Sequence, residues 1–104
     1  MTAMRTYQVI ISYAALTELE AMAQYIASIY RPESGHKYVN RILGQLAALS
    51  YSADAYQYSR FKMAKSIHPK AKTLTIINRK WTVVFHSDGD FVIVDRIFPS
   101  KTIF

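Results

Sequence analysis

The chain has 104 residues, 51% of them apolar, which is enough for one small domain spanning 1–104. It has no cysteine, so disulfides, thiolate chemistry and cysteine metal sites are excluded. No apolar run approaches the roughly 20 residues that cross a bilayer, and the N-terminus lacks a signal-peptide pattern. We therefore expect a cytoplasmic protein with no membrane partner.

The first half of the sequence predicts one strand followed by two helices. Residues 6–11 are rich in strand formers, and Ser12 stands where a helix N-cap is expected. Apolar residues then recur every three or four positions, which predicts a helix over about 13–30 that ends before Pro32. A second run over about 33–49 has the same period. The short connection predicts that the two helices pack as an antiparallel hairpin.

The second half predicts a three-stranded meander. Residues 51–66 have no clean period and indicate a loop with a short helical turn. Asn78 and the Asp88-Gly89 pair tolerate positive φ and predict tight hairpin connections. The strands that they separate are 72–77, 80–86 and 90–98. The predicted fold is α+β, with an N-terminal strand, an antiparallel helical hairpin and a three-stranded antiparallel meander, the helices packing on an antiparallel sheet.

The middle strand of the meander is largely apolar on both faces. Trp81, Val83 and Phe85 point one way, and Thr82, Val84 and His86 point the other. An antiparallel sheet with one wet face usually alternates more clearly. Either a partner covers the second face, or these residues are simply strand formers.

The net charge of +6 is concentrated in one part of the chain. Residues 1–54 are balanced, whereas 55–87 contain seven cations and no carboxylate. Such a block attracts phosphates or an acidic protein partner, although a solvated basic surface has the same composition. The candidate binding residues are Arg60, Lys62, Lys65, Lys70, Lys72, Arg79 and Lys80.

Two opposite charges, Asp95 and Arg96, interrupt the last apolar strand. An unpaired buried charge is costly, so each should find a partner or reach water near the strand end. Three tyrosines, Tyr51, Tyr56 and Tyr58, lie close to the basic block. They are interpreted as rings that fill the joint between hairpin and sheet, with base stacking as the alternative.

The chain as a whole resembles the RelE/ParE superfamily of type II toxin–antitoxin toxins, which includes plasmid stabilisation proteins. YQVIISYAALTELEAMAQYIA looks like the opening strand, serine and helix of the family, and KWTVVFHSDGDFVIVDRIF looks like its closing hairpin. Arg96, Ile97 and Lys101 match the arginine and isoleucine near the end of its last strand and the basic residue that follows. The resemblance implies a basic toxin that a cognate antitoxin neutralises.

Two targets are known in the superfamily: messenger RNA on the ribosome for RelE-like members and DNA gyrase for ParE-like members. The strand cations of the RelE-type ribonucleases align here with Thr73, Thr75 and Thr82, and their terminal basic position aligns with Lys101. Threonine is uncharged at neutral pH and cannot replace a cation or a base. With the long helical hairpin, this departure favours a ParE-like, gyrase-poisoning toxin.

Three alternatives remain open at this stage. A ribosome-dependent mRNA endonuclease would use Lys101, Arg96 and His86, although a half-buried structural histidine is the more usual interpretation of His86. A non-toxic nucleic-acid- or protein-binding module and an inactive toxin are the others. No cofactor is expected, and the three histidines lack the spacing of a metal site. The oligomeric state is open between a homodimer and a hetero-oligomer with the antitoxin.

Overall fold

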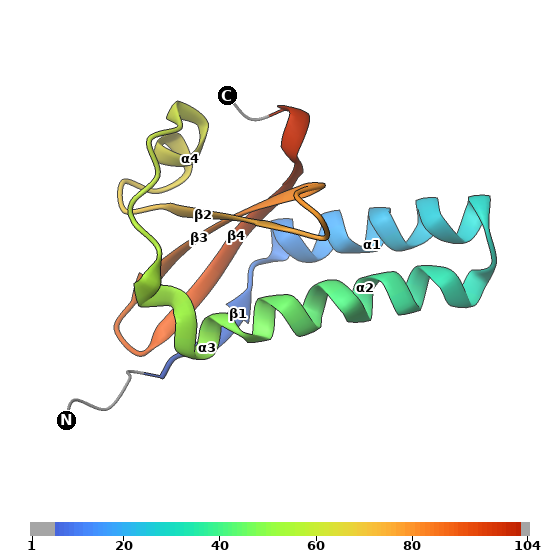
Figure 1. Ribbon diagram of the computed structural model, residues 1–104, viewed down its shortest axis with the longest axis horizontal. Helices are drawn as coiled ribbons and strands as arrows, with labels where there is room; N and C mark the ends of the chain where they lie inside the picture. Colours follow the sequence, from blue (N-terminus) through green and yellow to red (C-terminus); the bar gives the residue numbers. More distant parts are fainter. Residues whose placement is uncertain (1–5, 103–104) are drawn as a thin grey trace.

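The computed structural model describes residues 6–102 (Figure 1). Its elements follow the predicted order, with three short helical segments between the hairpin and the meander. They are β1 (Gln8–Ile11), α1 (Tyr13–Ile29), α2 (Pro32–Ala47), α3 (Leu49–Ser52), η1 (Ala53–Ala55), α4 (Lys62–Ile67), β2 (Lys72–Ile76), β3 (Trp81–Asp88), β4 (Phe91–Pro99) and η2 (Ser100–Thr102).

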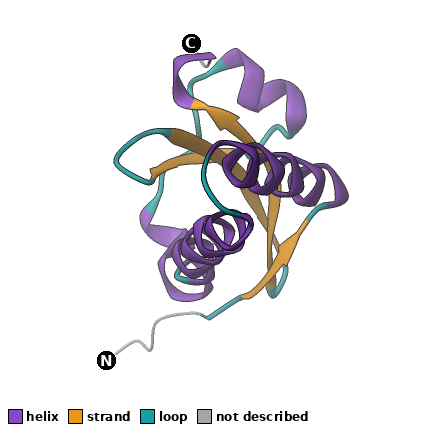
Figure 2. Ribbon diagram, turned by 90° about the vertical axis from the view of Figure 1, so that its right-hand side faces the viewer, coloured by secondary structure: helices purple, strands orange, loops and turns teal. Residues whose placement is uncertain are grey.

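The antiparallel helical hairpin is confirmed and extends well beyond the sheet (Figure 1). Ser12 caps α1 as expected, since its Oγ accepts a hydrogen bond from the backbone N–H of Ala15 at 3.1 Å. Pro32 ends the connection and also begins α2, where its missing N–H is not needed. The two helices lie side by side in both views (Figure 2).

The sheet has the order β1-β4-β3-β2, and the predicted antiparallel meander is confirmed. The expectation of a wholly antiparallel sheet is wrong, because β1 pairs with β4 in parallel. The hairpin returns the chain to the end at which β1 begins, where the N–H of Tyr7 donates to the carbonyl of Ser50 at 2.6 Å. From there β2, β3 and β4 alternate in direction, so β4 runs the same way as β1.

Two apolar layers form on opposite faces of the sheet. The larger joins the helical hairpin to β3 and β4, with Leu19, Ile42 and Phe85 almost fully buried. The smaller joins Val84 to Ala64 of α4. In Figure 1 the strands lie between α4 and α2. Around Val84, the chain's own α4 covers the second face, a cover that neither expectation named.

The two hairpin turns of the meander differ. Gly89 has a φ of 58° at the first position of the two-residue turn between β3 and β4. The turn between β2 and β3 is longer, with positive φ at Ile77, Asn78 and Arg79. A β-branched residue rarely adopts this conformation. Ile77 is buried, and its N–H donates to Oε1 of Gln45 on α2 at 3.2 Å. This hydrogen bond holds the β2–β3 turn against α2.

Candidate functional site

The C-terminal half of β4 has an edge that β1 does not cover. The pairing of β1 with β4 ends at Ile11 and Val94, and Ser12 then turns into α1. The backbone N–H of Ser12 donates to Val94 O at 3.0 Å, and its hydroxyl donates to Asp95 O at 2.8 Å. Beyond this point the side chains of α1, rather than another strand, face the edge of β4.

Glu18 of α1 satisfies this edge and holds Arg96. Its Oε1 accepts the backbone N–H of Ile97 at 2.9 Å and Nε of Arg96 at 3.2 Å, while its Oε2 accepts from Nη2 of Arg96 at 3.1 Å. The guanidinium also lies over the ring of Phe98, 4.6 Å from its centroid. The expectation that Arg96 finds a partner is confirmed, and its orientation is fixed from two sides.

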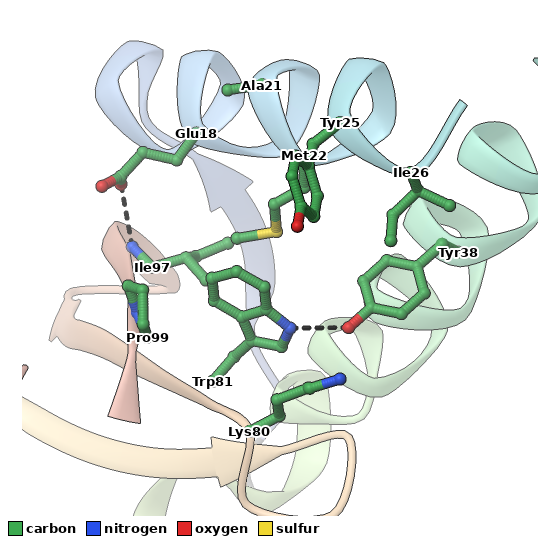
Figure 3. Close-up of a pocket in the computed structure, with 10 residues that line it drawn as sticks. All are labelled: Glu18, Ala21, Met22, Tyr25, Ile26, Tyr38, Lys80, Trp81, Ile97 and Pro99. Atoms are coloured by element: carbon green, nitrogen blue, oxygen red, sulfur yellow. Dashed lines mark hydrogen bonds between the residues drawn. The ribbon is translucent and has the colours of Figure 1, made fainter. Parts of the chain in front are cut away.

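A groove of about 490 Å³ opens between α1 and this edge (Figure 3). Its walls are mainly apolar side chains, and Lys80 extends from the β2–β3 turn beside Trp81 toward the helix that carries Tyr38 (Figure 3). Trp81 forms one wall and is held by a hydrogen bond from its Nε1 to the hydroxyl of Tyr38 at 2.7 Å (Figure 3). The described lining is Glu18, Ala21, Met22, Tyr25, Ile26, Tyr38, Lys80, Trp81, Ile97 and Pro99.

A neighbouring hollow contains Lys101, the second residue of the predicted site. It measures about 550 Å³, and Arg79 and Lys80 line it beside Lys101. Tyr25, Trp81 and Pro99 belong to its lining and to that of the groove, so the two are continuous. The structure therefore brings Lys101 together with Arg79 and Lys80, at the C-terminal end of β4.

A β-bulge explains the charged interruption of the last strand. Phe85 pairs with Val94 and Val84 pairs with Arg96, which leaves Asp95 as the extra residue. Val92 and Val94 are buried two positions apart, but the next buried residue is Ile97, three positions after Val94. The alternation of buried and partly exposed residues therefore resumes one position late. The regular alternation of side chains along β4 is therefore interrupted at Asp95.

Asp95 pairs with His86 on β3. Its Oδ2 lies 2.6 Å from Nδ1 of His86, and both side chains are largely buried. The ring of His68 stacks on His86 with 3.8 Å between centroids. Nδ1 of His68 in turn accepts the N–H of Lys70 at 3.0 Å. His86 is thus fixed between a carboxylate and a second imidazole, away from the hollow that contains Lys101.

The positions aligned with the RelE-type strand cations meet in one place. Thr73, Thr75 and Thr82 line a hollow of about 440 Å³ together with Phe61, and Thr82 Oγ1 lies 2.9 Å from Ser100 Oγ. The described lining of this hollow contains no lysine or arginine. The three threonines therefore lie together, and the hollow that they line is uncharged.

The basic block does not form one surface. Lys62 and Lys65 are exposed on α4, with Arg60 before it and Lys70 after it, whereas Arg79 and Lys80 lie in the β2–β3 turn. Figure 1 shows α4 and this turn at separate places on the molecule.

Lys72 differs from the other cations because it is buried. Its Nζ donates to the carbonyl of Ala53 at 3.1 Å and lies 5.7 Å from the ring centroid of Tyr58. The charge of Lys72 therefore stabilises the fold and is not part of a binding surface. Of the three tyrosines, Tyr56 packs in the core against Phe85, while Tyr51 and Tyr58 are exposed.

Sequence reasoning missed two groups at this site, Glu18 and the Asp95–His86 pair. Glu18 is one of two carboxylates on α1, and only the early end of β1 marks it as the residue that faces the open edge of β4. The His86–Asp95 pair depends on the bulge.

In residues 6–102, no group of three or more His, Asp or Glu side chains is arranged to hold a metal ion. Across the same range, every helix is too short or too polar to span a bilayer.

No protein-family profile matches the sequence, and no curated protein sequence is significantly similar to it. The fold, however, is similar to a solved structure described as the chromosomal ParDE TA system from P. aeruginosa. The alignment has a TM-score of 0.74, covers 91% of this chain and 97% of that one, and has 21% sequence identity. The fold expected from the resemblance, with an N-terminal strand, a helical hairpin and a three-stranded antiparallel meander, is confirmed.

Proposed function

We propose that this chain is the toxin of a type II toxin–antitoxin pair that acts in the cytoplasm, and that its α1–β4 groove receives a segment of the cognate antitoxin. The observation that carries the proposal is the groove of about 490 Å³ beside the part of β4 that β1 leaves uncovered. An extended or helical peptide docks readily in such a groove. The similarity to the ParDE structure supports this assignment.

Gyrase poisoning is the favoured activity. Metal-independent RNA cleavage needs a base, cations that stabilise the charged phosphorane, and an acid for the leaving oxygen. The hollow at the corresponding strand positions offers Thr73, Thr75 and Thr82 instead. Their hydroxyls bind polar groups but provide no positive charge, which argues against RelE-type cleavage.

Ribosome-dependent mRNA cleavage is the second candidate, and the Asp95–His86 pair favours it. A histidine whose Nδ1 is held by a carboxylate keeps Nε2 for proton transfer. The other two residues predicted for such an enzyme lie elsewhere, since Arg96 is bonded to Glu18 and Lys101 lies beside Arg79. This candidate requires that His86 act without them.

One experiment separates these functions: the protein is induced alone in bacteria, and growth, transcript integrity and plasmid supercoiling are measured. A gyrase poison arrests growth and alters supercoiling while transcripts stay intact. Cleaved transcripts with normal supercoiling, lost in His86→Gln, would establish the ribonuclease instead. Normal growth at good soluble expression would identify a non-toxic binding module or an inactive toxin.

The groove is tested with a charge placed in its wall. Ala21 is exposed on α1 and lines the groove, so Ala21→Arg should prevent neutralisation by the co-expressed antitoxin and leave toxicity intact. Ala47→Arg, at the exposed end of α2, is the matched control and should remain neutralised. Equal neutralisation of both variants would place the antitoxin elsewhere.

A further inference from the structure

Cations from three separate parts of the chain meet around Lys80. Lys37 and Arg41 lie one turn apart on α2, hence on the same side of the helix. They line a hollow of about 390 Å³ together with Lys80 from the β2–β3 turn. Lys80 also lines the hollow that contains Arg79 and Lys101. We call these five residues the Lys80 strip. Two of them come from the half of the sequence whose charges balance.

Exposed aromatic rings line the same hollows as these cations. Tyr30, at the tip of the hairpin, is 69% exposed and lines the hollow with Lys37 and Arg41. Tyr25 is 65% exposed and lines the hollow with Lys101. Tyr38 supports the surface between them, because its hydroxyl accepts the hydrogen bond from Trp81. Tyr25 and Tyr30 are therefore accessible rings beside the cations of the strip.

Acidic side chains offset little of this charge. Glu18 is the one carboxylate in the described lining of the three hollows around Lys80, and it is already bonded to Arg96. Glu33 lies one turn before Lys37 on α2, is exposed, and lines none of these hollows. The surface keeps a net positive charge over a continuous path from α2 to η2.

We propose that the Lys80 strip binds single-stranded nucleic acid, with its cations on successive phosphates and with Tyr25 and Tyr30 as stacking surfaces for bases. A basic groove interleaved with exposed aromatic rings is the usual composition of such a site. An acidic peptide would need the cations but not the rings, and bases inside a duplex cannot stack on them. The proposal does not rest on toxicity or on the antitoxin.

The test is fluorescence anisotropy of the intact protein with a labelled single strand of about 12 nucleotides, within the ~4–16 typical of one site. The variant Lys37→Gln/Arg41→Gln/Lys80→Gln should bind at least about tenfold more weakly. Its slope of log affinity against log salt should be smaller by about 2, since each lost phosphate contact contributes ~0.7. Tyr30→Leu should weaken binding by about fivefold or more, the lower end of one lost stack.

The matched control is Arg60→Gln/Lys62→Gln/Lys65→Gln, which removes the same charge around α4. Unfolding by heat is measured for every variant, and the affinity comparison uses those that retain the fold. Equal weakening by the two triple variants would overturn the proposal, because net charge alone would then explain binding. Full affinity in Tyr30→Leu, together with equal competition by an acidic peptide, would also overturn it and identify a surface for an acidic protein.

Discussion

Gly35 of α2 lies directly against the backbone of Ala23 in α1, so closely that a Cβ on Gly35 would overlap the Ala23 carbonyl oxygen. Backbone atoms inside two packed helices cannot move aside without separating the hairpin. We therefore expect Gly35→Ala to destabilise the protein by about 1–3 kcal/mol, despite the higher helix propensity of alanine. The free energy of unfolding in urea measures this change.

Gly44 provides the control on the same helix. A Cβ built there meets nothing within 4 Å, and the residue is exposed. Gly44→Ala should therefore stabilise the protein by up to about 1 kcal/mol through propensity alone. If Gly35→Ala and Gly44→Ala change the free energy of unfolding in the same direction, the close approach of Gly35 to the Ala23 backbone is contradicted.

Glu18 is expected to be the carboxylate of α1 that stability depends on. Glu18→Ala removes the acceptor of the Ile97 N–H and the partner of Arg96, which should cost about 1.5–3 kcal/mol. Much of the loss belongs to the backbone N–H, because Arg96 is 39% exposed and its ion pair is screened by water. Glu18→Gln keeps an acceptor and should cost less.

Thermal unfolding of the two variants checks this, with Glu20→Ala as the control. Glu20 is exposed on the same helix and should change stability by no more than about 0.5 kcal/mol. A loss as large in Glu20→Ala as in Glu18→Ala would show that helical charge, rather than the β4 edge, explains the effect.

Local patterns account for the parts of the fold that could be predicted. The helical period of residues 13–30 and 33–49 and the turn residues around Gly89 each depend on a few neighbours in sequence. The resemblance added the alignment of the RelE-type strand cations with Thr73, Thr75 and Thr82, and these three residues line one hollow. The matching solved structure confirms the overall arrangement.

Long-range contacts account for the parts that could not be predicted. The parallel pairing of β1 with β4 depends on where the helical hairpin returns the chain. The charged pair Asp95–Arg96 marks the place of the bulge in the sequence, but the bulge itself is defined by the pairing of β4 with β3. The block of cations was expected to act together, yet burial removes Lys72, and Lys37 joins Lys80 from another part of the chain.

Lys72 is expected to stabilise the fold, unlike its exposed neighbour Lys70. Its ammonium donates to Ala53 O in η1, and its side chain is buried. Lys72→Ala should cost about 1–3 kcal/mol, since it leaves a buried carbonyl without this donor and removes packed methylenes. Lys70→Ala should be nearly neutral in the same urea titration. A neutral Lys72→Ala would mean that this side chain remains hydrated and free to bind ligands.

Toxicity is expected to depend on Lys101 more than on the cations around α4. Lys101 lies at the C-terminal end of β4 beside Arg79 and Lys80, in the position that resembles the family's terminal basic residue. Lys101→Ala removes an exposed charge and should reduce growth inhibition by at least about tenfold with little change in stability. Arg96→Ala should also reduce it, but with some loss of stability, because Glu18 then loses its partner. Viable counts after induction measure the effect, normalised to soluble protein.

Lys65→Ala, on α4, is the control and should stay fully toxic. If Lys101→Ala and Arg96→Ala are both as toxic as the unmodified protein, the end of β4 is not the working surface.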